Sequence, residues 1–285
     1  MKKKIKEIYN AKNIDGLIPG VKGHRAFPTL SFRATDPFLM LDHIGPEVVG
    51  GEWLLDGKGH DHPHKGFETL TFMFEGNMQH RDSLGNRVEL TSGSVQRMNA
   101  GSGIIHGGDM ASDSITQRFH EMQLWVNNPI SEKMSLPDID TVSGDDIGRF
   151  SQGNVTLRVI SGVLNGVRGK IVTKADTQIA HLIATGKGTI KIGEFPIENT
   201  VMVYMLEGDI SINGSIIEMY QLVTFEADNR VIEIETKCAA QLIILSGKPL
   251  NEPVVFGGPF VMNTTEEINQ ANIDFQNGKF GSIIN

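Results

Sequence analysis

The sequence predicts an all-β protein made of two similar halves, and three observations support this fold class. Short runs rich in β-branched and aromatic residues alternate with turn signals along the 285 residues, as in sandwiches and barrels. The 32 glycines are spread along the chain and do not pool in one linker. Short patterns also recur in both halves. The runs with the strongest strand character are residues 69–74, 155–160, 201–206 and 240–245.

The recurring patterns follow matching strands. Phe74-Glu75-Gly76 comes after one strand, and Leu206-Glu207-Gly208 comes after another. Each is followed by a hairpin tip, at residues 84–86 and 212–215, where Gly and Asn tolerate the positive φ that tight turns need. We therefore expect two copies of one β unit. The expected domains are residues 1–136 and 137–285, with a linker in the acidic, polar stretch 137–148.

One helix is expected near the C-terminus, over residues 264–275. Asn263 or Thr264 can cap its first turn. Glu266 and Glu267 place negative charge in that turn, where the helix dipole favours it. The apolar stripe of this segment is partial and consists of Ile268, Ala271, Ile273 and Phe275.

Composition and charge argue against several classes of protein. The net charge is -8, and the only basic cluster lies in residues 2–6, which we interpret as a solvated tail. Direct binding of nucleic acid is therefore not expected. Cys238 is the only cysteine, so no intrachain disulfide can form, and we expect it to be a small core residue. The N-terminus has no apolar signal core and no apolar run reaches about 20 residues, so we expect a cytoplasmic protein without membrane contact.

The run His60-Asp61-His62-Pro63-His64 carries the chemistry of the first half. Residues two apart in a strand point to the same face, so His62 and His64 present two imidazoles side by side. A later histidine, His106, ends the glycine-rich segment 99–106. Neutral imidazoles in such a group suit one divalent transition metal such as iron, copper, nickel or zinc.

These residues also carry a family resemblance. Residues 57–68, followed by Gly76, resemble the first cupin motif, and residues 93–106 resemble the second. In finer detail the chain resembles the pirin family. The segments that match, in order, are residues 36–42, 61–69, 80–82, 98–106, 123–127 and 258–263. The resemblance implies a bicupin, with two β-barrel or jelly-roll-like cupin domains and a short C-terminal helical segment, in which only the N-terminal domain holds metal.

The resemblance also implies a ligand set. Pirins usually hold one iron per chain through three histidines, which correspond to His62, His64 and His106, and a glutamate two residues after the last histidine. That position is Gly108 here, and glycine offers no side chain. The replacements that we consider are Asp109, Glu68 and water.

Both carboxylates have difficulties as ligands. Asp109 would need the paired glycines before it to turn it inward. Four extended residues cover roughly 13 Å, so Glu68 reaches the ion that His64 binds only if the chain bends at Gly66. Glu68 can instead orient a histidine from outside the ligand set.

The remaining histidines receive lesser roles. His60 is expected at the rim of the pocket, and His181, the only histidine of the second half, is expected to be structural. His43, His80 and His120 are expected to line the pocket or to be satisfied by hydrogen bonds.

Two main functions follow. The first is a metal-dependent dioxygenase of the quercetin 2,3-dioxygenase type, acting on a small aromatic or flavonol-like substrate, with Glu68 or Asp109 as the base. The alternative is a non-enzymatic, metal-dependent regulator that binds a protein partner. A metal-free, degenerate bicupin is a third and weaker hypothesis.

Overall fold

A computed structural model describes residues 1–18, 20–33, 35–49, 53–55 and 60–284. Gly57, at the start of the first cupin-like motif, lies outside these residues. Contacts divide the chain into two compact units. Unit 1 consists of Met1–Lys12, His24–Pro37 and Asp146–Pro249, and unit 2 consists of Asn13–Gly23, Phe38–Asp145 and Leu250–Asn285.

The N-terminal segment belongs to the unit built mainly from the second half of the chain, and the C-terminal segment belongs to the unit built mainly from the first half. In unit 1 the N-terminal strand β1 (Ile5–Asn10) pairs with β23 (Gln221–Phe225). In unit 2 the C-terminal helix packs on a strand that follows residue 250. The predicted single boundary after residue 136 stays a prediction. Local sequence patterns suggested one cut because they do not reveal pairings between distant segments.

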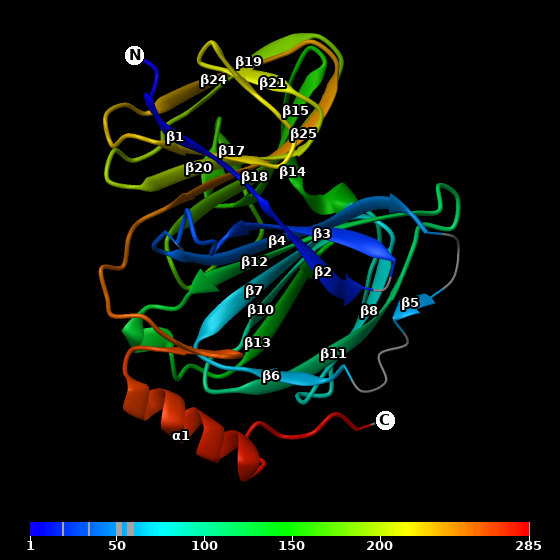
Figure 1. Cartoon of the computed structure of the whole chain (residues 1–285), viewed down its shortest axis with the longest axis vertical. Helices are drawn as coiled ribbons and strands as arrows, with labels where there is room; N and C mark the ends of the chain where they lie inside the picture. Colours follow the sequence, from blue (N-terminus) through cyan, green and yellow to red (C-terminus); the bar gives the residue numbers. More distant parts are fainter. Residues whose placement is uncertain (19, 34, 50–52, 56–59, 285) are drawn as a thin grey trace. The chain divides into compact units, whose positions relative to one another are not determined.

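The unit 1 strands form two main sheets (Figure 1). The larger has the order β1-β23-β20-β25-β18-β15-β14, and the smaller has the order β19-β24-β21-β22. Their bounds are β14 Gly148–Gln152, β15 Val155–Ser161, β18 Thr177–Thr185, β19 Gly188–Gly193, β20 Thr200–Glu207, β21 Ile210–Ile212, β22 Ser215–Ile217, β24 Val231–Thr236 and β25 Ala239–Gly247. A two-stranded ribbon, β16 Val163–Leu164 with β17 Val167–Arg168, completes the paired strands described in this unit.

The sheet that carries most of unit 2 has the order β13-β10-β7-β12-β4-β3-β2, and a second has the order β5-β11-β8-β9, with β6 paired to β11. The bounds are β2 Lys12–Ile18, β3 Val21–Phe27, β4 Phe38–Val48, β5 Trp53–Leu55, β6 His62–His64, β7 Phe67–Glu75, β8 Asn77–Asp82, β9 Arg87–Leu90, β10 Val95–Asn99, β11 Ile104–Ala111, β12 Arg118–Asn127 and β13 Asp138–Val142. A small ribbon joins β26 Val255–Gly257 to β27 Phe260–Met262.

The two units share one topology. The order β10-β7-β12-β4-β3 in unit 2 corresponds to β23-β20-β25-β18-β15 in unit 1, and β5-β11-β8-β9 corresponds to β19-β24-β21-β22. The predicted repeat is therefore confirmed, as are the four predicted strands and both hairpin tips. Asn213 and Gly214 have positive φ at the second tip, as the short connection requires.

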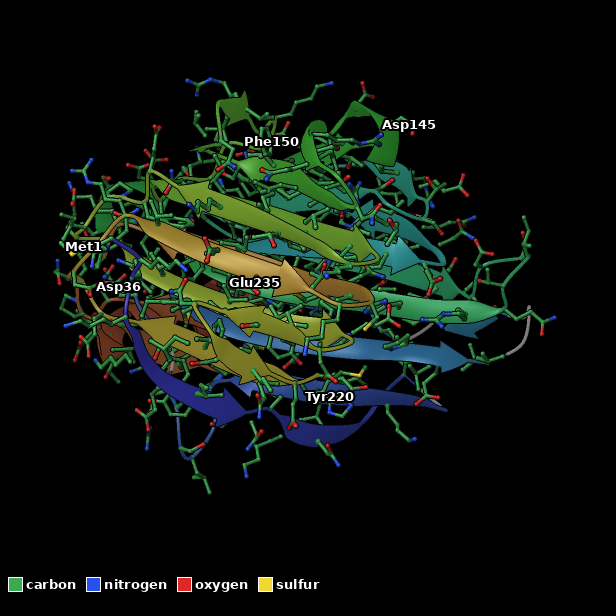
Figure 2. The ribbon with its side chains drawn as sticks, turned by 90° about the horizontal axis from the view of Figure 1, so that it is seen from above. Met1, Asp36, Asp145, Phe150, Tyr220 and Glu235 are labelled. Carbon is green, nitrogen blue, oxygen red and sulfur yellow. The ribbon has the colours of Figure 1, made fainter. Side chains whose placement is uncertain are left out.

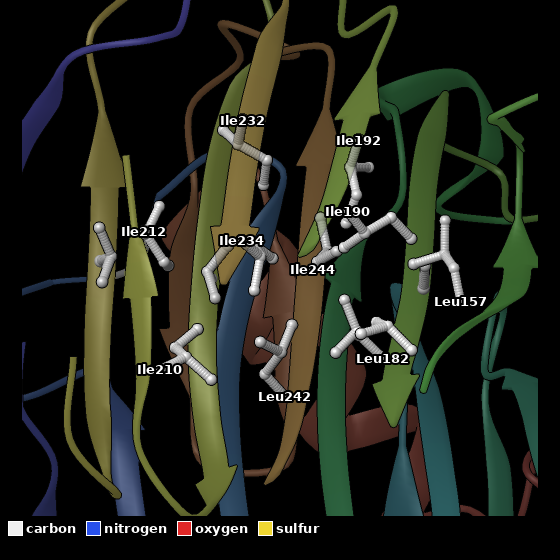
Figure 3. Packing of buried hydrophobic residues seen from close by; sticks show 14 of the residues in the cluster. Leu157, Leu182, Ile190, Ile192, Ile210, Ile212, Ile232, Ile234, Leu242 and Ile244 are labelled. Atoms are coloured by element: carbon white, nitrogen blue, oxygen red, sulfur yellow. The ribbon is translucent and has the colours of Figure 1, made fainter. Parts of the chain in front are cut away.

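The core of unit 1 is aliphatic. Ile190, Ile234 and Ile244 come from three strands of its two sheets and are fully buried (Figure 3). His24 stacks on Tyr220, which is labelled in Figure 2, with ring centroids 3.6 Å apart. This stacking helps to explain why segment 24–37 belongs to unit 1.

The predicted linker is wrong in part, because residues Asp138–Val142 form β13, which pairs with β10 along five residues. Two of the acidic side chains in the predicted linker are paired with a cation of the sheet. Arg97 Nη1 donates to Asp138 Oδ1 at 2.6 Å, and Asp140 lies 3.3 Å from the same guanidinium. Charge pairing therefore lets a polar segment close the edge of the unit 2 sheet.

The predicted helix is confirmed as α1 (Thr265–Gln276), and Thr264 is its cap. The Thr264 hydroxyl accepts from Glu267 N at 3.1 Å, while the Glu267 carboxylate accepts from Thr264 N at 3.0 Å. In the part of the chain that the structure describes, no helix has the length and apolar character needed to cross a membrane. Cys238 was expected in the core, but it is exposed in the turn between β24 and β25.

A buried lysine joins three segments of unit 2. Lys133 is 2% exposed, and its Nζ donates to Gly66 O at 2.8 Å, Asn127 Oδ1 at 2.6 Å and Val261 O at 2.9 Å. Its three ammonium protons are thus all used. Burial lowers the pKa of Lys133 to about 8. The ammonium ties the turn after β6 to β27.

We expect Lys133→Met to lower the free energy of unfolding of unit 2 by about 3 kcal/mol, because three buried acceptors lose their donor. Denaturant titration followed by tryptophan fluorescence measures this effect in unit 2, since both tryptophans, Trp53 and Trp125, belong to it. Lys279→Met, at an exposed lysine, is the control and should change stability by less than about 1 kcal/mol. Equal effects of the two substitutions would contradict the role of Lys133.

Candidate metal centre

Two short strands bring the three predicted histidines to one face. In the antiparallel pairing of β6 with β11, His62 lies opposite His106 and His64 lies opposite Ile104. Opposite residues share a face, as do residues two apart, so all three imidazoles point the same way. The turn after β6 requires Gly66, which has a φ of 85°, and a Cβ at this position would lie only 2.1 Å from Val261 O.

The three imidazoles form one compact group. One ring nitrogen from each of His62, His64 and His106 lies within 4.8 Å of the others. The ring centroids are 4.4 Å apart for His62 and His106, and 5.0 Å apart for His64 and His106. His62 is exposed, whereas His64 and His106 are buried. No carboxylate of the described residues joins this group.

Hydrogen bonds leave the inward nitrogens available. His62 Nδ1 lies 2.8 Å from the carbonyl of His60, and His64 Nδ1 lies 3.2 Å from the carbonyl of Pro259. Donation at Nδ1 makes Nε2 the lone-pair nitrogen of each ring. The buried His64 Nε2 and both nitrogens of His106 have no hydrogen-bond partner among the described residues.

The electrostatics keep the rings of His64 and His106 neutral. Burial, and then the neighbouring His62, lower the pKa of His64 to about 3. Burial, followed by the charges of His64, His62 and His80, holds the pKa of His106 well below its usual value. Neutral imidazole is the form that binds metal. Buried nitrogens without partners, in a group whose ligand atoms lie within 4.8 Å of one another, therefore fit a divalent transition metal.

Glu68 does not join the histidines. It lies opposite Val126 and Asn99, on the face of β7 that also carries Leu70. The other face of β7 carries Phe67, whose ring centroid is 5.1 Å from that of His64. Glu68 instead lies 3.6 Å from Arg97 Nη1 on its own face. The bend at Gly66 is present, but the strand turns the carboxylate away from the group.

Asp109 is also directed elsewhere, since its Oδ1 lies 3.4 Å from Arg81 Nη1. Gly108 lies opposite His80 on the face of β11 that carries His106. A Cβ at Gly108 would lie 2.9 Å from Met78 Cε and 3.0 Å from Gln79 O. The methionine therefore fills part of the space that a side chain at position 108 would occupy.

A cavity of about 260 Å³ opens beside the histidines. His62, His106 and Gly108 line it from β6 and β11, whereas Asp42 and Glu121 line it from β4 and β12. Glu121 is 1% exposed, and its Oε2 has no hydrogen-bond partner among the described residues. Burial, and then the charge of Asp42, raise the pKa of Glu121 to about 7.

Asp42 and Glu121 were not predicted as pocket residues from the sequence. Asp42 ends a motif that was used only for the family resemblance, and the motif 123–127 begins two residues after Glu121. One signal was present. The strand alternates between Glu121, Gln123 and Trp125 on one face and Met122, Leu124 and Val126 on the other, which marks Glu121 as a charged residue in a buried strand.

The other histidines are placed as follows. His60 is exposed and lines the cavity. His43 and His120 are buried, with 2.8 Å between their Nε2 atoms. His80 Nε2 lies 3.2 Å from Asp82 Oδ2. In unit 1, His181 is buried between Arg158, at 3.3 Å, and Gln241, at 2.9 Å, so both ring nitrogens have partners.

Two jelly-roll-like units of one topology, with a His-x-His strand facing a third histidine in unit 2, define a bicupin with a candidate metal centre. The chain belongs to the pirin family. The family model described as Pirin matches residues 20–126, and the model described as Pirin C-terminal cupin domain matches residues 180–281.

Individual relatives agree with this assignment. The chain is 34% identical to a putative quercetin 2,3-dioxygenase of Pseudomonas aeruginosa, covering 98% of each chain. It is also 34% identical to human pirin, covering 92% of this chain and 89% of that one. Among solved structures, a quercetin 2,3-dioxygenase from Acinetobacter baumannii matches with a TM-score of 0.87 and 30% identity over the whole of both chains.

We expect His106→Leu to lower the affinity for a divalent metal by more than about 100-fold, because it removes one of three grouped imidazoles. Calorimetric titration of the metal-free protein with Co²⁺ or Ni²⁺ measures this loss. His60→Ala is the matched control, because it removes a neighbouring exposed imidazole and keeps the carbonyl that holds His62. Retention of wild-type affinity by His106→Leu would rule out this ligand set.

The raised pKa of Glu121 predicts a pH-dependent stability. Between the usual glutamate pKa of 4.5 and about 7, the folded protein keeps a proton on Glu121 that the unfolded chain releases. The contribution of this proton to the free energy of unfolding is therefore fully present below pH 4.5 and is lost as the pH rises through about 7. Relative to Glu121→Gln, the metal-free wild type should lose on the order of 3 kcal/mol across this window. The test is denaturant titration of both proteins at several pH values with a chelator present. If the free energies of unfolding of the two proteins changed in parallel with pH, the burial of this acid would be contradicted.

Proposed function

We propose that the protein is a metal-dependent dioxygenase of the quercetin 2,3-dioxygenase type. The observation that carries this proposal is the group of three imidazoles, with free inward nitrogens, at the wall of a cavity of about 260 Å³. The names of the relatives in Pseudomonas aeruginosa and Acinetobacter baumannii support the same reaction class. The expected substrate is a small aromatic, flavonol-like molecule.

The lining of the cavity suits such a ligand. Ile18, Ile44, Met78 and Met110 offer apolar surface to a flat ring system. Gln123 and His60 offer polar groups at the same cavity and can orient hydroxyl groups by hydrogen bonds. The volume is close to the roughly 300 Å³ at which small-molecule pockets begin.

His62 and His64 would hold the metal through Nε2, and His106 would supply the third nitrogen. A bound divalent ion would supply Lewis acidity, which lowers the pKa of a coordinated hydroxyl group. The residues of the chain keep the rings oriented through the carbonyls of His60 and Pro259, and the buried side of the group excludes water. Iron is the expected metal, and its identity stays a prediction because imidazoles accept several divalent ions.

The alternative function, a metal-dependent regulator with a protein partner, stays a prediction, as does the cytoplasmic location. No specific feature of the described residues favours the regulator over the enzyme.

The proposal predicts loss of the flavonol absorbance when the iron-loaded protein is mixed with quercetin in air, together with uptake of O₂. The metal-free protein and His106→Leu should show no turnover above background, whereas Lys279→Met, at a residue that does not line the cavity, should retain activity. The assay is repeated with copper, nickel, cobalt and manganese. Absence of turnover with every metal, in protein that binds the metal, would reject quercetin as the substrate.

A further inference from the structure

The cavity beside the histidines has an acidic wall. Among the described residues that line it, only Asp42 and Glu121 carry carboxylates, and they come from β4 and β12. The histidines come from β6 and β11. A ligand that reaches the histidine group through this cavity therefore shares one space with the Glu121 carboxylate.

The register of the sheet, rather than a loop, presents Glu121 to the cavity. Glu121 lies opposite Ile44 of β4 and Met73 of β7. Gln123, two residues further on the same face, lies opposite Asp42. Pairing on both sides of β12 fixes this face, since a slip of one residue would turn Glu121 away from the cavity.

The carboxylate of Glu121 has an oxygen that makes no hydrogen bond to the described part of the fold. Its Oε2 is buried without a hydrogen-bond partner among the described residues, and it lies near a second acid, Asp42. A buried polar atom without a partner destabilises a protein by about 1–3 kcal/mol. Such a group in a cavity, with a strongly perturbed pKa, is typical of functional sites.

The described acidic residues close to the histidines in sequence cannot take this place. Asp61 and Asp109 pair with Arg81, and Glu68 lies on the other face of β7 with Arg97. At position 108 there is no side chain, and Met78 occupies part of the space beside it. Glu121 on β12 therefore remains as the carboxylate that lines the cavity without an assigned partner among the described residues.

We propose that Glu121 is the base that accepts a proton from a hydroxyl ligand bound at the three histidines. The proposal rests on the proposed function and adds a residue to it. The ligand is taken to be a hydroxyketone, the class to which flavonols belong. In this step its O–H bond breaks, Oε2 of Glu121 takes the proton, and the electron pair stays on the ligand oxygen. No oxidant is consumed in the step.

The charge environment suits the transfer. On β4 the neutral Ile44 lies opposite Glu121, and Asp42 lines the same cavity. The neutral Met73 lies opposite Glu121 on β7, and His62 and His106 line the cavity from β6 and β11. With a pKa of about 7, Glu121 accepts a proton readily near neutral pH and releases it again.

The first test is anaerobic binding of quercetin to the metal-loaded protein, because the flavonol anion absorbs at longer wavelength than the neutral form. In Glu121→Gln the bound flavonol should become anionic at a pH at least about one unit higher than in the wild type. In air, kcat should fall by about 100-fold while KM changes little. Metal content, measured on the same samples, should be unchanged.

Glu75→Gln is the matched control. Glu75 ends β7, its Oε2 accepts from Arg118 Nε at 2.6 Å, and it does not line the cavity. This variant should behave as the wild type in the binding spectra. An unchanged spectral midpoint and an unchanged kcat in Glu121→Gln would overturn the proposal.

A second probe separates this proposal from the proposed function. Maltol is a small hydroxyketone that can bind a metal but is not a flavonol. If quercetin does not bind the wild type while maltol binds as its anion, and Glu121→Gln raises the pH of that change, the flavonol assignment fails and the role of Glu121 is supported. If the variant behaves as the wild type with maltol, or if neither probe binds the wild type, the role of Glu121 is rejected.

Discussion

The alternation of side chains along paired antiparallel strands decides what the unit 2 cavity contains. β7, β12 and β4 pair over most of their lengths, so each residue of β12 is fixed opposite a residue on both neighbours. One face carries Phe67, Gln123 and Asp42 toward the histidine side, and the other carries Leu70 and Leu124 into packing. Because this register assigns every carboxylate to a face, Glu68 and Glu121 differ in role although both are buried glutamates.

Buried polar groups in unit 2 include two contrasting sets. Lys133 uses all three of its protons in hydrogen bonds, and these contacts join segments that are distant in the sequence. His64, His106 and Glu121 are equally buried, but each keeps at least one polar atom without a described partner. The contacts of Lys133 stabilise the fold, whereas the atoms without partners lower its stability and lie in the histidine group and at the cavity beside it.

Local patterns in the sequence predicted much of this structure. The His62-Pro63-His64 run, the cap at Thr264, and the tip at Asn213 and Gly214 each depend on neighbours within a few residues. Features that depend on distant pairing were missed. The acidic stretch that contains Asp138 was interpreted as a linker, because the Arg97 that neutralises it lies 41 residues away. Glu121 was overlooked because its face is set by the register with Ile44 and Met73, which no short motif reports.

The hydrogen bond between His64 and Pro259 has a consequence for biosynthesis. The two residues are 195 positions apart, so the ribosome makes the carbonyl that orients the second histidine long after it makes the histidine. The segment with Pro259 also brings Val261, whose carbonyl is bound by Lys133. During translation all three histidines emerge early, but the site reaches its final geometry only when the last part of the chain is complete. A metal held by all three histidines in this geometry would therefore have to bind after the segment with Pro259 has been made.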